Sequence, residues 1–164
     1  MQASATQAAY LIRIYDRWLS GLDDSDRAWS PAPESKTAGW LLGHLVITGD
    51  FGRRLCGLPP LSPKEWRTLF SPGTAPSPDA AAYPPMADLV RMFRSIYADL
   101  VANAPHAAPE ALAAPNPYEP ARGAFPTAGS FVEYMLTGHL AYHLGQLSVW
   151  RSARAAAEPR LRQA

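Results

Sequence analysis

Residues 139–147 read His-Leu-Ala-Tyr-His-Leu-Gly-Gln-Leu, and this stretch anchors the interpretation of the chain. On a helix, residues four apart share a face with their Cβ atoms roughly 6 Å apart, so His139 and His143 are spaced to reach one metal ion. The surrounding pattern predicts a long helix over about 127–155. At about 100° per residue, both histidines lie in the middle of its buried arc. The arc comprises Val132, Met135, Leu136, His139, His143, Gln146, Leu147 and Trp150.

A third histidine, His44, lies in a similar apolar context, Leu41-Leu-Gly-His-Leu45. It belongs to a helix predicted over about 37–56, capped by Ser35 or Thr37 and ended by Gly57. Taken alone, His44 is more simply a core histidine bonded to a backbone carbonyl. Because an unpaired buried imidazole is costly, a shared metal explains all three histidines together. The buried arc around His44 comprises Thr37, Trp40, Leu41, Ile47, Thr48, Phe51 and Leu55.

The motif also excludes several kinds of metal site. Residue 140 is Leu, so the pair is not the HExxH motif of zinc proteases, which supplies a glutamate base. Asp50 and Glu133 point away from both histidine arcs, which excludes a di-iron carboxylate bundle. Three neutral imidazoles suit a divalent ion such as Zn or Ni and leave positions open for water or substrate. A vestigial metal site would have the same sequence pattern.

The rest of the chain predicts an all-α protein. Further amphipathic helices are expected at about 6–22 and 85–103, with a short helical turn at 64–70. The apolar stripe of the first of these helices comprises Tyr10, Leu11, Ile14, Tyr15, Trp18 and Leu22. The 17 prolines fall in clusters between these segments, and stretches 71–84 and 105–126 read as irregular connections. No segment shows sustained two-residue alternation, so we expect essentially no sheet. We predict one domain, 1–164, folded as a four-helix bundle with long crossover connections.

The composition limits which binding partners and which cellular location we expect. The formal charge is +1, from 15 basic and 14 acidic residues, so there is no electrostatic footprint for nucleic acid. Cys56 is the single cysteine, which excludes an internal disulfide and fits a reducing compartment. The N-terminus lacks the basic start of a signal peptide, and no apolar run approaches the roughly 20 residues that span a bilayer. We therefore expect a cytoplasmic protein with no membrane partner.

Two motifs in this order resemble the DinB-like (DinB/YfiT-like) family of bacterial metalloproteins: Trp40-Leu-Leu-Gly-His44-Leu and the 139–147 stretch, with Phe125-Pro-Thr-Ala before the last helix. The resemblance covers nearly the whole chain. It implies a four-helix bundle with a long crossover and a metal held by His44, His139 and His143. Members of the family are similar to thiol-dependent transferases and isomerases that use low-molecular-weight thiols such as bacillithiol, mycothiol or glutathione. Others are called metal-dependent hydrolases, and many form homodimers through their helices. One fold hosts many functions, so the reaction transfers least well.

Three further residues are candidates for the site. Gln146 lies one turn past His143, where its amide can orient a ligating imidazole or a metal-bound water and so assist catalysis; the alternative is a polar group satisfied locally. Trp40, one turn before His44, would wall the pocket and contact a bound thiol, although a buried aromatic is more often plain core. Tyr142 lies about 60° from the centre of the arc, within reach of the pocket edge or of a dimer partner.

Four other residues are assigned lesser roles. Cys56 faces away from His44 and is expected to be a buried thiol, not a ligand. His106, next to Pro105, reads as a loop histidine. Arg53 and Arg54 are expected on a solvated face, with a position at the mouth of the pocket, facing an anionic thiol, as the alternative.

Three interpretations remain open from the sequence. The first is an enzyme in which a metal ion lowers the pKa of a bound thiol or water and presents it to an electrophile. Thiol transfer is favoured over hydrolysis because the histidine arcs offer no carboxylate base, and a thiol activated by a metal needs none. The second possibility is a non-enzymatic metal-binding stress-response protein. The third is a purely structural bundle with core histidines.

Overall fold

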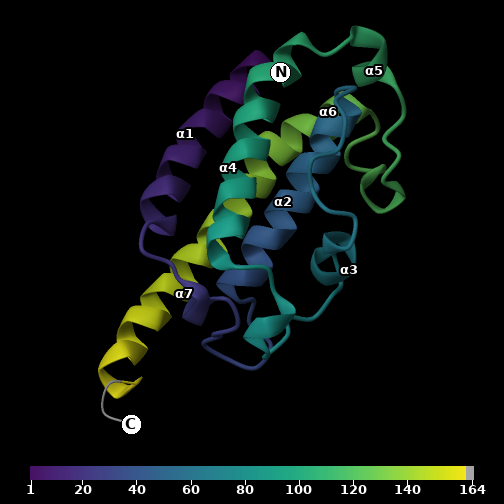
Figure 1. Cartoon of the computed structure of the whole chain (residues 1–164). Coiled ribbons are helices and arrows are strands. Elements are labelled where there is room, and N and C mark those ends of the chain that lie inside the picture. Colours follow the sequence, from purple (N-terminus) through teal and green to yellow (C-terminus); the bar gives the residue numbers. More distant parts are fainter. Residues whose placement is uncertain (162–164) are drawn as a thin grey trace.

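Four long helical segments form the bundle shown in Figure 1, a computed structural model that describes residues 1–161 and side chains through Ala157. The last three residues of the predicted domain lie outside the described residues. The long segments are α1 (Gln2–Leu19), α2 (Ala38–Leu55), α4 (Met86–Asn103), and a continuous rod of α6 (Ala128–Tyr134), a π-helical turn (Met135–His139) and α7 (Leu140–Leu161). Short helices are α3 (Trp66–Phe70) and α5 (Pro109–Ala113), with 3-10 turns at 24–26, 80–82, 104–106 and 119–121. Apart from one isolated bridge, residues 1–161 contain no β-structure, which confirms the predicted all-α bundle.

The order of helices around the bundle is α1, α4, α2, then the α6–α7 rod, which closes against α1 (Figure 1). Helices α2 and α4 run parallel, since Gly49 lies against Ile96 while Arg53, one turn further on, bonds Asp99. Parallel neighbours cannot be joined by a tight turn, so the chain from residue 56 to residue 85 travels back along the bundle and carries α3 on the way. This segment is the predicted long crossover.

The central element is α2, which is buried on nearly every face and packs against α3, α4 and the α6–α7 rod. Its glycines permit this close packing. A Cβ atom on Gly43 would lie 2.4 Å from the ring of Phe70, and one on Gly49 would lie 2.8 Å from the ring of Tyr97. The missing Cβ at Gly43 therefore lets α3 approach the helix face that carries His44.

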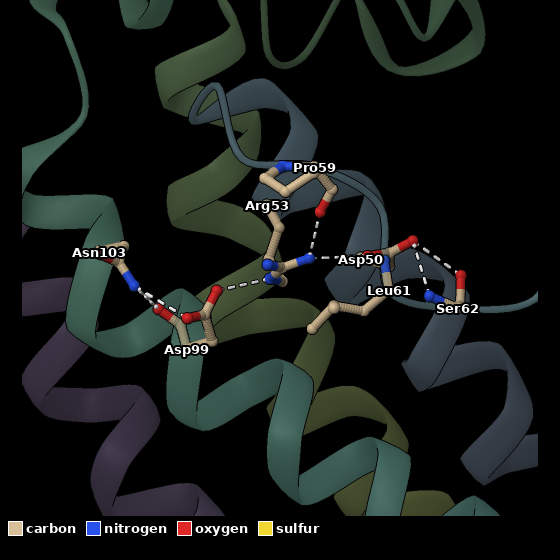
Figure 2. A network of polar contacts seen from close by, with 7 residues as sticks. All are labelled: Asp50, Arg53, Pro59, Leu61, Ser62, Asp99 and Asn103. Carbon is tan, nitrogen blue, oxygen red and sulfur yellow. Dashed lines mark hydrogen bonds and ion pairs between the residues drawn. The ribbon is translucent and has the colours of Figure 1, made fainter.

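A buried polar network ties the crossover to α2 and α4 (Figure 2). Arg53 donates to Asp50 at 3.1 Å and to Asp99 of α4 at 2.6 Å. Asp50 in turn accepts from the backbone N–H of Leu61 at 2.8 Å and from the hydroxyl of Ser62 at 2.7 Å. Arg53 is only 4% exposed, so the expectation that it lies on a solvated face is wrong. Its guanidinium donates hydrogen bonds to the two acids and to the backbone of the crossover inside the fold.

The boundaries of two helices differ from the sequence-based expectation. Helix α1 begins at Gln2, and Tyr10, assigned to its buried stripe from the spacing of large apolar residues, is 57% exposed. The buried positions of α1 are Ala5, Ala8, Tyr15 and Leu19. Small alanines let α1 approach its neighbours closely, which a pattern weighted toward large residues does not reveal.

The final rod is longer than expected and is not a regular helix throughout. It extends to Leu161, and the end of α7 projects beyond the other helices in Figure 1. Residues 155–157 are alanines, which favour continuation of the helix. The stretch expected to be irregular after residue 105 contains the short helix α5. Within residues 1–161, no helix has the length and apolar character required to cross a membrane.

Candidate metal centre

Three imidazoles, one from α2 and two from the α6–α7 rod, converge beside one another. The Nε2 atom of His139 lies 3.2 Å from Nε2 of His44 and 3.2 Å from Nε2 of His143. All three potential ligand atoms lie within 4.8 Å of one another. The antiparallel packing of α2 against the α6–α7 rod brings His44 to the other two across 95 residues of sequence. The structure therefore assembles the three histidines that the sequence singled out.

Hydrogen bonds on the far side of two rings decide which nitrogen carries the proton. Nδ1 of His44 lies 2.8 Å from the carbonyl oxygen of Phe70, and Nδ1 of His143 lies 2.7 Å from Oε1 of Gln146. A carbonyl oxygen only accepts, so each Nδ1 must be the donor. In the neutral rings, both Nε2 atoms therefore present bare lone pairs toward His139.

Without a cation, the hydrogen-bonding capacity of the three rings is not fully satisfied. A neutral His139 has one proton, which can satisfy at most one of the two facing lone pairs, and its buried Nδ1 has no hydrogen-bond partner among the described residues. A divalent ion accepts all three lone pairs. In a tetrahedral zinc site with Zn–N distances of about 2.0–2.1 Å, ligand nitrogens lie about 3.3–3.4 Å apart, close to the observed 3.2 Å. The donor set could hold a divalent metal ion.

Burial keeps these histidines in the form that binds metals. It lowers the pKa of His139 to about 2, with further lowering by the neighbouring His143 and His44. It lowers the pKa of His143 to about 4, and it also lowers the pKa of His44. Neutral imidazole is the form that coordinates, so protons compete weakly for these nitrogens near neutral pH.

The π-helical turn Met135–His139 ends on the first histidine of the pair. Such turns add one residue to a helical turn and are frequent at functional sites. Immediately after it, the hydroxyl of Tyr15 on α1 donates to the carbonyl of Leu140 at 2.8 Å. This contact helps hold the irregular turn in place. A helical wheel with a constant 100° per residue does not predict such a turn.

The histidines lie at the side of a cavity of about 540 Å³. Its walls are rich in aromatic rings, contributed by Trp40, Phe51, Tyr118, Phe125, Phe131, Tyr134 and Tyr142. Among the residues that line it there is no aspartate or glutamate. The cavity is therefore large enough for a small organic molecule and offers no carboxylate as a general base.

The three further candidates all line this cavity. Trp40 stacks on His44 with ring centroids 4.8 Å apart and planes 7° apart. Gln146 accepts from His143 and donates through Nε2 to the hydroxyl of Tyr142 at 3.2 Å. Tyr142 is 61% exposed, at the rim. Their positions fit the roles assigned from the sequence, which remain proposals.

Cys56 and His106 lie outside the histidine cluster, where the sequence interpretation put them. Cys56 is buried, and burial raises the pKa of its thiol to about 11. His106 is exposed in a 3-10 turn. The two acids considered as ligands are engaged elsewhere: Asp50 in the Arg53 network, and Glu133 with the N-terminal amine.

The sequence interpretation missed three groups at the site: the Phe70 carbonyl, Lys36 and Arg67. Lys36 lies with its ammonium 3.7 Å from the ring centroid of Trp40, and Arg67 of α3 lines the cavity. Lys36 precedes the first residue of α2, so helical spacing does not place it. Arg67 and Phe70 reach the site because α3 packs against α2, for which the sequence carries no local signal.

A family model described as the DinB superfamily, a metal-binding superfamily, matches residues 8–147. The match includes all three histidines, the whole of α2 and α4, most of α1, and the final rod as far as residue 147. Comparisons with curated proteins and with solved structures find no match. With most of its length matched and its three histidines assembled in one cluster, the chain belongs to the DinB superfamily.

Proposed function

We propose that this protein is a metal-dependent transferase that joins a low-molecular-weight thiol, of the bacillithiol, mycothiol or glutathione type, to an electrophile. The observation that carries the proposal is the convergence of three Nε2 atoms on a cavity with no carboxylate in its lining. A hydrolase normally needs a base to take a proton from water. A thiol needs less help, because its pKa of about 8.5 is far below that of water.

A bound divalent ion, Zn or Ni by ligand type, would lower the pKa of a thiol and hold it as the nucleophilic thiolate. The residues of the chain have separate tasks. Phe70 and Gln146 keep the His44 and His143 rings in the tautomer that presents Nε2. Trp40 and Tyr142 line the cavity beside the histidines and would contact the thiol. The aromatic walls exclude water from the apolar part of an electrophile.

The test is a thiol screen on protein loaded with Zn or Ni, using monochlorobimane as the electrophile and elemental analysis to establish occupancy. We expect conjugation with at least one thiol that is lost on chelation and in the His143→Ala variant. The matched control is His106→Ala, which removes a histidine outside the cluster and should keep full activity. A fully loaded protein that conjugates none of the thiols would contradict the proposal. Ester hydrolysis by that protein would support a hydrolase, and its absence a metal-binding stress-response protein.

The predicted homodimer and cytoplasmic location are part of the same proposal. Two apolar residues of α7, Tyr142 and Val149, are 61% and 68% exposed, and a second copy packed along α7 would bury them. Light scattering on the metal-loaded protein would test this, since a monomer at micromolar concentration would exclude a stable dimer. The reducing cytoplasm is where low-molecular-weight thiols would be available to the site.

A further inference from the structure

The cavity beside the histidines is lined by three basic side chains and by no acidic side chain. The three are Lys36, Arg54 and Arg67. None of the ion pairs formed by the described side chains includes any of the three. Half-buried cations normally find a carboxylate or leave the cavity for water.

The two arginines reach the cavity from different elements. Arg54 is in the last turn of α2 and Arg67 is in α3. Burial lowers the pKa of Arg54 most, the positive charge of Arg67 lowers it further, and the negative charge of Asp50 raises it. Like charges that face one cavity repel each other, and an anion bound between them would relieve that repulsion.

Arg54 also has a buried donor without a partner. Its Nε is inaccessible to solvent and makes no hydrogen bond with any described residue. Its guanidinium carbon lies 5.0 Å from the centroid of the Phe51 ring, and Phe51 in turn packs edge-on against Phe131. The side chain of the arginine thereby lies against an apolar wall of the cavity.

We propose that this cavity binds an organic carboxylate whose charged end lies between Arg54 and Arg67 and whose apolar body packs on the rings of Phe51 and Phe131. Guanidinium groups bind planar carboxylates through paired hydrogen bonds, and the rings exclude water from the remainder of the ligand. The inference rests on the proposed function, since this ligand is the substrate that would meet the activated thiol, but binding of the carboxylate does not require transfer.

The test compares 3-phenylpropanoate with the uncharged 3-phenylpropanamide, using dissociation constants from ligand-observed NMR on zinc-loaded protein. We expect the carboxylate to bind at least tenfold more tightly than the amide. Charge-assisted hydrogen bonds of this kind contribute enough for Arg54→Gln or Arg67→Gln to weaken carboxylate binding by about ten- to a hundredfold and leave amide binding unchanged. Phenyl phosphate is included as a second oxyanion, and tighter binding than the carboxylate would overturn the choice of a carboxylate.

The matched control is Arg17→Gln, the same change on an exposed arginine of α1, a helix that contributes nothing to the cavity. Arg54→Lys and Arg67→Lys keep the charge and should bind with intermediate affinity, which separates lost contacts from lost folding. Equal binding of acid and amide would overturn the inference.

Repeating the titration on chelator-treated protein separates this subsite from the metal. Retained preference for the carboxylate supports the arginine subsite, even if no thiol transfer is ever found. A preference that disappears with the metal and is unchanged in both arginine variants would mean that the carboxylate binds the ion, and would overturn the inference.

Discussion

Nδ1 of His44 lies 2.8 Å from the backbone carbonyl oxygen of Phe70, a residue of the crossover segment 26 positions away. The contact sets the tautomer of His44 and directs its Nε2 toward the other two histidines. Phe70 is the last residue of α3, and its backbone carbonyl is present whatever its side chain. The orientation of His44 therefore depends on where α3 lies. Substitutions that displace α3 should therefore affect the site as well as stability.

Gly43→Ala tests this coupling between α3 and the site. The added Cβ would lie 2.4 Å from the fully buried ring of Phe70, so α3 must shift. We expect a loss of about 1–3 kcal/mol in the free energy of unfolding and weaker metal binding, measured by urea denaturation and by competition with a chromophoric chelator. Gly145→Ala in α7 is the control, because its Cβ would meet nothing within 4 Å. That change should stabilise the protein by about 0.5–1 kcal/mol; equal effects of the two variants would contradict the coupling.

Metal content should depend on the three histidines and on no other. We expect about one divalent ion per chain by elemental analysis, because one ion satisfies all three facing Nε2 atoms. The His139→Ala/His143→Ala double variant should lose it and His44→Ala should bind it more weakly, whereas His106→Ala should retain it. Full occupancy in the double variant would remove the basis for the metal centre.

Gln146→Ala should lower turnover by about 10- to 100-fold while leaving metal content largely intact. Its Oε1 accepts a hydrogen bond from Nδ1–H of His143 at 2.7 Å, so the change releases the ring without removing a ligand. Gln146→Glu keeps an accepting oxygen and should recover most of the activity. Turnover and metal content measured on the same preparations decide the point: if Gln146→Ala loses its metal, the residue is a ligand or a structural support.

Stability of the metal-free protein should fall as the solution becomes acidic. The pKa of His143 is lowered to about 4 and that of His139 to about 2, both below the usual value of 6.5. Below pH 6.5 the unfolded chain therefore binds protons that the folded chain does not, and acid favours unfolding by up to about 1.4 kcal/mol per pH unit for each histidine. Above about pH 7 this contribution is complete and constant.

The measurement is urea denaturation of metal-free protein between pH 7.5 and pH 4.5. Carboxylates also titrate toward the lower end of that range, but they are common to the wild type and to the His139→Ala/His143→Ala variant. The difference in slope therefore isolates the two histidines, and the variant should depend less on pH. Identical slopes would show that the histidines titrate normally in the metal-free fold.

Arg53→Met should destabilise the protein by about 3–5 kcal/mol, because it leaves the buried carboxylate of Asp50 without its cation. The network in Figure 2 also holds the start of the crossover, so metal binding should weaken in the same variant. The matched control is Arg91→Met. Arg91 also pairs with an aspartate three residues earlier in the chain, Asp88, but this pair lies on the exposed surface of α4. The control substitution should change the free energy of unfolding by less than about 1 kcal/mol. Comparable losses from both variants, in urea denaturation at pH 7, would argue against a special role for the buried pair.

Much of the fold could be predicted from local sequence. Helix α2 was predicted at 37–56 and occupies Ala38–Leu55, because Thr37 caps its first turn and Gly57 ends it. The third amphipathic stretch, 85–103, became α4 almost residue for residue. Such signals depend on neighbours within one or two turns, which the linear sequence contains in full.

Two features depended on contacts that local patterns do not encode. The buried face of α1 follows its alanines and not Tyr10, because the adjacent helices determine how closely α1 can pack. The π-helical turn before His139 keeps the spacing to His143 but alters the phase of the helix before it. A helical wheel assumes a constant 100° and therefore cannot detect this shift.

By itself, the sequence determined the four helices, the histidines on their apolar faces and the absence of a nearby carboxylate. Only the tertiary structure decided that the Phe70 carbonyl lies behind His44, that Arg54 and Arg67 line the same cavity, and that Arg53 is buried. Residues four apart on a helix share a face by geometry alone. Residues brought together by a crossover of about 30 residues meet only because two helices run parallel and the chain must return between them.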